Sequence, residues 1–370
     1  MKSIFGDQIQ ICLFGESHSP AVGVVLNGLA PGIRLDLEFI QSQMDKRRAK
    51  GRISTARREA DEVRFLSGFF NGYTTGTPLC LLIENQQTRS GDYEAAKWLP
   101  RPSHADYTAF EKYGGFQDYR GGGHFSGRLT APIVAAGGIA LQILKSHGIR
   151  VGTHILRLGD WKDTAFSPRE TELEQQIARL DGDGFPTLDA DIGGSMVRAV
   201  EEAASEGDSL GGVLETAVVS LPAGVGEPFF CSVESKLSQL LFSIPAVKGV
   251  EFGLGFGFAG LRGSQANDPF RMENDRVTTQ TNHNGGLNGG ITNGMPVLFR
   301  TAVKPTPSIY QPQDTVDLEK RENARLQIQG RHDPAIIHRA RVVVDSMAAL
   351  GLLDLLTERF GPRWMTEGTP

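Results

Sequence analysis

The chain has 370 residues, enough for one large domain or two ordinary ones, and its 39% hydrophobic and 22% charged content excludes an intrinsically disordered protein. A net charge of −5 excludes a general polyanion binder but leaves room for a local basic patch. Three widely separated cysteines, Cys12, Cys80 and Cys231, exclude a disulfide framework and a cysteine-based zinc site.

The N-terminal stretch, MKSIFGDQIQICLFGESH, contains no long apolar run. We also expect no other stretch to approach the roughly 18 to 20 apolar residues that a membrane span requires. The sequence therefore predicts a cytoplasmic protein without a membrane partner.

The first predicted helix covers residues 35–48. Its spacing places Leu37, Ile40 and Met44 on one face, and basic residues fill its last turn, where the helix dipole favours cations. Residues 128–148 are apolar nearly all round and rich in small side chains, which predicts a buried helix with close neighbours.

A further helix is predicted for residues 167–180. Ser167, Pro168 and Glu170 have the pattern of a capping box, and Leu173, Ile177 and Leu180 would form the apolar face. By contrast, residues 262–294 are polar and rich in glycine, which predicts a long loop.

Apolar runs between turn residues predict six strands. These strands do not alternate regularly with helices, and no Gly/Ser-rich or Pro-rich linker divides the chain. This order favours a single α+β domain over residues 1–370, with antiparallel sheets, over a parallel dinucleotide-binding sheet. The predicted strands are GVVLNG, TPLCLLI, THILRLG, VLETAVVSL, GVEFGLGFGF and PVLFRTAV.

The run DKRRAKGRISTARRE contains seven basic residues between Lys46 and Arg58. It could be a solvated charged loop or an anion clamp, because guanidinium groups match carboxylates and phosphates with two hydrogen bonds. Nucleic acid is the weaker candidate, because no aromatic residue is interleaved for stacking on bases. A non-catalytic binding module for a phosphorylated metabolite or nucleic acid remains an alternative.

Three histidines, His18, His104 and His332, lie in loops marked by glycine or proline and next to charged residues, where acid/base groups are often found. His147 and His154 fall in a helix end and a strand, where a structural role is expected. His18, His104 and Asp333 could together form a metal site, although their spacing gives no support for one. Metal-assisted hydrolysis is therefore only a secondary alternative.

Ten stretches in order along the chain resemble the chorismate synthase family. The resemblance implies helices sandwiched between antiparallel sheets, a homotetramer, and reduced FMN as cofactor. It also implies a lyase that removes phosphate and the ring C6 proton from 5-enolpyruvylshikimate 3-phosphate to give chorismate. NADPH as a reductant of the flavin remains open. The ten stretches are FGESHSPAVGVVLNGLAPG, RREADEVRFLSG, TTGTP, RPSHADY, DYRGGG, AVKGVEFG, LRGS, NHNGGLNGGI, KPTPSI and GRHDP.

The resemblance also implies roles for individual residues. His18 would protonate the leaving phosphate, His104 would protonate the reduced flavin near N1, and Asp333 would help to take up the C6 proton. Substrate and FMN bring about five negative charges into a closed site, so arginines are the expected counter-ions. The implied substrate-binding residues are Ser17, Arg47, Arg52, Arg101, Arg128 and Arg331. The implied FMN-binding residues are His124, Phe125, Ser126, Pro245, Ala246, Gly289, Lys304, Pro305, Thr306, Pro307, Ser308 and Arg331.

The chain departs from the family pattern at a few positions. His124 and Phe125 replace an arginine and a serine that are usual in the glycine-rich stretch, so a ring would replace a charged flavin contact. Ser19 stands where glycine is usual, and Asp345 where glutamate is usual.

Overall fold

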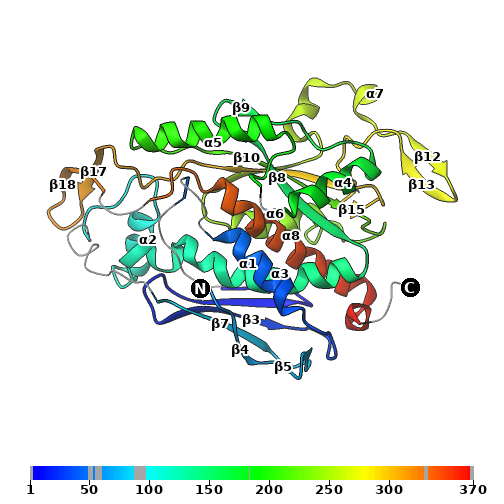
Figure 1. Ribbon diagram of the computed structural model, residues 1–370, viewed down its shortest axis with the longest axis horizontal. Coiled ribbons are helices and arrows are strands. Elements are labelled where there is room, and N and C mark those ends of the chain that lie inside the picture. The colour runs from blue at the N-terminus through cyan, green and yellow to red at the C-terminus, as the bar shows by residue number, and fades with distance from the viewer. Residues whose placement is uncertain are drawn as a thin grey trace.

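The computed structural model describes residues 3–48, 53–54, 61–86, 97–182, 184–328 and 332–366. Two five-stranded antiparallel sheets enclose a layer of helices (Figure 1). This arrangement confirms the α+β class and the sandwich that the resemblance implied. One cluster of buried apolar side chains extends from Ile9 to Met365 through this layer.

The first sheet, at the bottom of Figure 1, is formed by the N-terminal part of the chain. Its central strand alternates as expected for a sheet with one covered face: Val22, Val24 and Leu26 are buried against the helices, and Val25 points to the other side. The strand order is β1 (Ile4–Phe5), β2 (Gln10–Gly15), β3 (Ala21–Asn27), β7 (Leu79–Glu84) and β4 (Arg64–Ser67).

The second sheet covers the opposite side of the helices, and its four longer strands match four of the six predicted strands. Its order is β11 (Val247–Phe252), β16 (Val297–Val303), β10 (Gly212–Val219), β8 (Arg150–Leu158) and β9 (Trp161–Lys162). Short hairpins form separate two-stranded sheets: β5 (Phe69–Phe70) with β6 (Tyr73–Thr74), and β17 (Gln313–Asp317) with β18 (Glu322–Leu326).

The helical layer is centred on α3 (Thr130–Ser146) and α8 (Ile337–Phe360), with α1 (Leu37–Arg47) and α6 (Val233–Phe242) beside them. Small residues allow α3 and α8 to approach closely, since a Cβ added at Gly137 would lie 2.1 Å from the Cβ of Ser346. In α1, Ile40 and Met44 are buried as predicted, but Leu37 is 46% exposed because it begins the helix outside the packed face.

The expectation that no stretch resembles a membrane span was wrong. Among the described residues, Gly127–Ser146 has the length and apolar composition of a span. In the structure, 83% of its most apolar window is buried inside the protein, because α3 packs against α1, α8 and both sheets.

The helices α4 (Glu170–Leu180) and α5 (Ala190–Ser205) lie outside the central layer. The helix α4 covers the outer face of the second sheet with Leu173 and Ile177, and α5 lies beside β9. The predicted capping box was wrong, because α4 begins at Glu170 with Arg169 as N-cap. Ser167 instead donates its hydroxyl to Glu172, at 2.7 Å.

The segment 262–294 is not one long loop. It contains the short helix α7 (Gly263–Ala266), the hairpin of β12 (Phe270–Glu273) and β13 (Arg276–Thr279), and the hairpin of β14 (Leu287–Asn288) and β15 (Ile291–Thr292). The Asp268 carboxylate connects parts of this segment, because it accepts hydrogen bonds from Thr281 and from the backbone of His283 and Asn284.

Candidate active site

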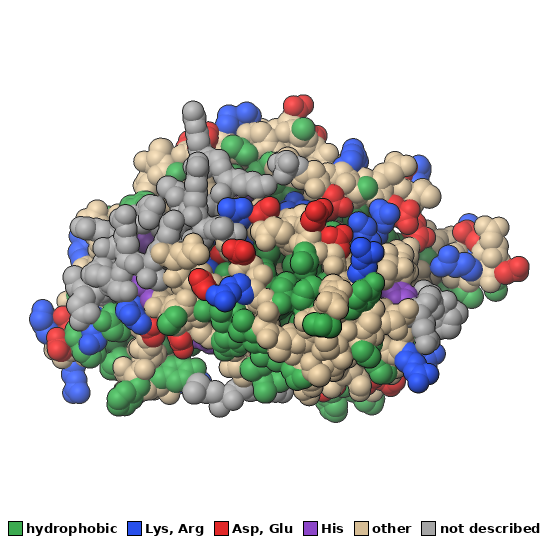
Figure 2. Space-filling model, turned by 60° about the horizontal axis from the view of Figure 1, so that its bottom comes forward, with side chains coloured by type: hydrophobic (Ala, Val, Ile, Leu, Met, Phe, Trp, Pro, Cys, Tyr) green, Lys and Arg blue, Asp and Glu red, His purple; other side chains and the backbone are tan. Residues whose placement is uncertain are grey.

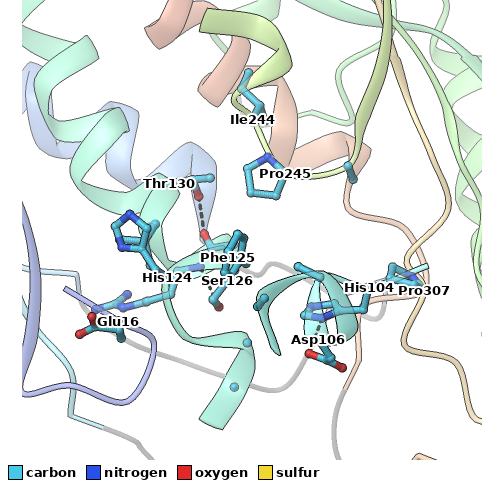
Figure 3. Close-up of a pocket in the computed structure, with 18 of the residues that line it drawn as sticks. Glu16, His104, Asp106, His124, Phe125, Ser126, Thr130, Ile244, Pro245 and Pro307 are labelled. Carbon is cyan, nitrogen blue, oxygen red and sulfur yellow. Dashed lines mark hydrogen bonds and ion pairs between the residues drawn. The ribbon is translucent and has the colours of Figure 1, made fainter. Parts of the chain in front are cut away.

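A cavity of about 2550 Å³ opens beside the helical layer. Segments from distant parts of the chain line it, including the turn after β2, the end of α1, the loop before α2 (Asp106–Tyr113) and the stretches 244–247, 304–308 and 332–340. Figure 3 shows His124 and His104 on either side of Phe125 and Ser126. Many of the predicted site residues therefore line one cavity, although they are distant in sequence.

The stretch DYRGGGHFSGR, residues 118–128, forms tight turns that lead into α3. Gly121 and Gly122 have φ values of +60° and +85°, where a side chain would be strained. A Cβ at Gly121 would lie 2.7 Å from His18 Cδ2, and one at Gly122 would lie 3.1 Å from His104 Cε1. Two consecutive glycines thus contact the two histidines that the resemblance marks as catalytic.

Ser17 and His18 are buried in the turn that follows β2 and face Gly121. The Ser17 amide donates to Gly123 O at 3.0 Å, which ties this turn to the glycine loop. Ser19, the departure from the family's glycine, closes the same turn: its hydroxyl lies 2.9 Å from Glu16 O and 2.7 Å from Ala21 O. Ser17 and His18 lie behind Gly121 and do not themselves line the cavity.

His104 lines the cavity and contacts Asp106, the first residue of α2. Its Nδ1 lies 2.7 Å from Asp106 Oδ1, and Arg101 donates to both oxygens of the same carboxylate. Burial opposes ionisation of Asp106, but hydrogen bonds from Arg101 and His104 outweigh it and hold the pKa of Asp106 well below its usual range. Arg101 is therefore engaged with an internal carboxylate.

Arg47 and Arg128 share a buried carboxylate, that of Asp61. Arg47 Nη1 lies 2.8 Å from Asp61 Oδ2, and Arg128 Nη1 donates to Asp61 Oδ1. The other donors of each guanidinium group are also used: Arg47 Nε bonds to Thr130 Oγ1, and Arg128 Nε to Asn85 Oδ1, each at 2.8 Å. The two guanidinium groups are thus held in fixed orientations at the cavity wall.

Asp333 also lines the cavity, next to the start of α8. Arg339 Nη1 donates to Asp333 Oδ2 at 2.6 Å, and Arg339 Nε donates to the backbone oxygen of Arg47 at 2.9 Å. Arg339 therefore connects Asp333, the predicted proton acceptor, to the backbone of Arg47.

Most of the predicted flavin-binding residues line the same cavity. His124 Nδ1 lies 2.8 Å from Gly15 O, and the ring of Phe125 is 6.2 Å from that of Tyr113. Burial and the nearby Lys248 lower the pKa of Lys304, whose ammonium group donates to Ser103 O. The lining members are His124, Phe125, Ser126, Pro245, Ala246, Lys304, Thr306, Pro307 and Ser308.

Some predicted residues are placed elsewhere. Gly289 lies in the turn between β14 and β15, and neither it nor Pro305 lines the cavity. Arg52 and Arg331 lie outside the described residues. In the described part of the chain, no three His, Cys, Asp or Glu side chains are grouped as a metal ion would require.

The histidines expected to be structural have structural surroundings. His147 stacks on Trp364 with ring centroids 4.4 Å apart, and His154 is fully buried between Asp163 and Glu215. Burial disfavours a charged His154, but hydrogen bonds to the two carboxylates outweigh it and raise its pKa.

Sequence reasoning missed three residues that orient the others: Asp61, Asp106 and Arg339. Each lies within or just after a quoted motif, in READEV, RPSHAD and the residues after GRHDP. The sequence feature that could have revealed them is a charged residue of opposite sign near a predicted site residue. Spacing alone does not say which charges pair, because the partners of Asp61 come from α1 and from the end of the glycine loop.

Comparison with known proteins agrees with the resemblance. The family model described as chorismate synthase matches residues 9–357. A chorismate synthase of Thermococcus gammatolerans is 47% identical over 354 residues, covering 96% of this chain and 97% of the relative. One of Dehalococcoides mccartyi is 47% identical over 356 residues, covering 96% of both. A crystal structure of a chorismate synthase aligns with a TM-score of 0.76 at 27% identity, covering 96% of this chain and 94% of that chain.

Proposed function

The chain belongs to the chorismate synthase family, lyases of the shikimate pathway, and we propose that its large cavity holds 5-enolpyruvylshikimate 3-phosphate together with reduced FMN. The observation that carries this proposal is that His104, Asp333, Arg47 and Arg128 all line one cavity. Its volume of about 2550 Å³ exceeds the 300 to 1,000 Å³ of a site for one small ligand.

The lining residues fit a reduced flavin mononucleotide. Lys304, Thr306 and Ser308 supply donors of the kind that a phosphate group requires, while Phe125 and Pro245 supply apolar surface for a ring system. When bound, reduced FMN would lend an electron to the substrate and recover it after phosphate has left, which removes the difficulty of losing a non-acidic C6 proton.

The chain's own residues would then bind anions and move protons. Arg47 and Arg128 are oriented at the wall, where they would attract the substrate's carboxylates and phosphate. His104 would supply a proton near flavin N1, and Asp333, oriented by Arg339, would accept the C6 proton. Arg101, Arg52, Arg331 and Ser17 are proposed to complete the substrate site.

His18 would protonate the leaving phosphate from its position beside the glycine loop. Gly121 lines the cavity and contacts the imidazole, since a Cβ at Gly121 would lie 2.7 Å from His18 Cδ2. This geometry requires the phosphate to sit against Gly121, where backbone amides would also be available to an anion.

The alternative of a non-catalytic binding module is not favoured, because the family match spans most of the chain. The basic run also has less positive charge available to a ligand than its composition indicates, because carboxylates of the chain pair with several of its residues. In its described part, Lys46 pairs with Asp181, Arg48 with Asp45 and Arg47 with Asp61.

A cytoplasmic homotetramer without a nucleic-acid partner is also part of the proposal. Self-association is supported by the outer face of the first sheet, where the register places Cys12, Val25 and Cys80 in one uncharged row. Figure 2 shows hydrophobic side chains at the centre of this side of the molecule. Ile4, Leu66 and Phe70 are 51%, 55% and 69% exposed, as expected of a surface that a second copy covers.

The direct test replaces the two proposed catalytic histidines under anaerobic conditions with reduced FMN. We expect His18→Ala and His104→Ala each to lower kcat by about 10² to 10⁴, the usual contribution of an acid/base group, with the fold intact by circular dichroism. His147→Ala is the control and should keep kcat, because His147 stacks on Trp364 instead of facing the cavity. Full activity of either His18→Ala or His104→Ala would refute the role of that histidine.

A further inference from the structure

The carboxylate of Asp106 accepts hydrogen bonds from Arg101 and contacts His104, beside which Figure 3 shows it. Oδ2 accepts from the backbone amide of Arg101 at 3.0 Å and from its Nε at 2.7 Å. Oδ1 accepts from Arg101 Nη2 at 2.8 Å and contacts His104 Nδ1 at 2.7 Å. Asp106 also begins α2, where the helix dipole favours an anion.

These contacts determine which nitrogen of His104 carries a proton when the ring is neutral. An ionised carboxylate can only accept hydrogen bonds, so the 2.7 Å contact requires a proton on Nδ1. Arg101 Nη2, which also donates to Asp106 Oδ1, lies 3.0 Å from Nδ1, but the contact between Nδ1 and the carboxylate is shorter and favours the proton on Nδ1. Nε2 is then the nitrogen left for the cavity, at the edge of the ring that faces Gly122.

We propose that Asp106 is a positioning residue for His104, which fixes the ring orientation and the Nδ1–H tautomer so that Nε2 is presented to the cavity. This inference rests on the proposed role of His104 as a proton donor. In that role, a charged imidazolium would give up its Nε2 proton while Nδ1 keeps its bond to Asp106. The carboxylate would also stabilise the positive charge that the ring carries before transfer.

A positioning role of Asp106 differs from a merely structural role in its dependence on His104. If Asp106 acts through His104, its replacement affects turnover only while His104 is present. If it serves only to hold Arg101 or the start of α2, its replacement affects substrate binding or stability whether or not His104 is present.

The test is a double-mutant cycle with Asp106→Asn, His104→Ala and the double variant, measured as kcat and KM with substrate and reduced FMN. We expect Asp106→Asn to lower kcat by about 10- to 100-fold, the effect of losing a carboxylate that orients a metal-ligating histidine, with little change in KM. In the His104→Ala background the same substitution should change kcat by less than about twofold. An equal loss in both backgrounds, or full activity of Asp106→Asn, would overturn the inference. Full activity of His104→Ala would instead refute the role of His104 itself.

A second readout needs no cofactor or substrate. In protein labelled with ¹⁵N-histidine, the His104 signals can be assigned by their loss in His104→Ala. At a pH where the ring is neutral, we expect Nδ1 of His104 to be protonated in the wild type and the signal to change to the Nε2–H form in Asp106→Ala. An Nε2–H form in the wild type would overturn the inference.

Discussion

At the scale of single residues, backbone conformation decides which side chains can meet. The glycine loop brings His18 and His104 to neighbouring positions because Gly121 and Gly122 allow φ values of +60° and +85° and have no side chains to fill the space. The excess of glycine in this stretch therefore serves close approach as well as chain reversal.

The variant Gly121→Ala should separate the effect of close approach from the effect of chain reversal. Its Cβ would lie 2.7 Å from both His18 Cδ2 and Ser17 Oγ, so we expect kcat to fall at least about tenfold as these groups move. Gly148→Ala is the matched control, with a φ of +79° and no atom within 4 Å of the added Cβ. Both variants should lose about 1 to 2 kcal/mol of stability from the left-handed conformation. Equal kcat in the two variants would contradict the proposed importance of the loop's contacts.

Many of the residues that the sequence predicted for the candidate site line the cavity, but its internal counter-ions were not predicted. His104, Asp333, Arg47, Arg101 and Arg128 were all predicted, and all line the cavity. The carboxylate that joins Arg47 to Arg128 was not, because the left-handed backbone at Asp61, with φ of +48°, is not visible in a residue pattern.

At the scale of elements, the buried face of a helix was predicted more reliably than the residue at which the helix begins. The helix at 170–180 buries Leu173, Ile177 and Leu180 as predicted, although its start was placed too early. A sequence with the capping pattern can form an N-cap but need not do so. Here the Ser167 hydroxyl donates to the Glu172 carboxylate instead. The hairpins within 262–294 were missed because each of their strands has only two to four residues, too few for a strand pattern to be recognised.

The contact between α3 and α8 gives an element-scale prediction. Gly137→Ala would place a Cβ 2.1 Å from the Cβ of Ser346, so we expect a loss of about 1 to 3 kcal/mol in the free energy of unfolding. Gly138→Ala, one residue along the same helix, meets nothing closer than 3.4 Å and should be neutral or slightly stabilising. Denaturant unfolding measures both. A larger loss in Gly138→Ala than in Gly137→Ala would contradict the packing.

Asp345 in α8 gives a prediction about pH. It accepts a hydrogen bond from Thr153 Oγ1 at 2.6 Å, and burial raises its pKa to about 6. Because this value exceeds the roughly 3.9 of an unfolded chain, the folded state binds more protons between these values. Its contribution to stability is therefore full below about pH 4 and falls as the pH rises through 6.

The variant Asp345→Asn has no such titration. Relative to the wild type, its free energy of unfolding should rise by on the order of 3 kcal/mol between about pH 4 and pH 7. The difference between the two proteins, measured by denaturant unfolding at each pH, checks this. A difference that stays constant with pH would show that Asp345 does not titrate in this range.

At the scale of the whole molecule, the sandwich brings residues from distant parts of the chain to one cavity. Arg47 comes from the end of α1, Arg128 from the turn before α3, and Asp333 from the residues before α8. The cavity is less positive than its arginines alone indicate, because Asp61, Asp106 and Asp333 each pair with an arginine. Orientation by these carboxylates would make the proposed site preformed, so that its anionic ligands need not order free side chains on binding.

The central claim is that this cavity supports flavin-dependent elimination of phosphate. The most direct measurement is anaerobic release of phosphate from 5-enolpyruvylshikimate 3-phosphate by the wild-type protein, with reduced FMN, without it, and with reduced FMN plus a chelator. We predict that phosphate and chorismate appear in equal amounts only with reduced FMN, and that the chelator has no effect. Phosphate release at the same rate without flavin, or its loss with the chelator, would contradict the claim.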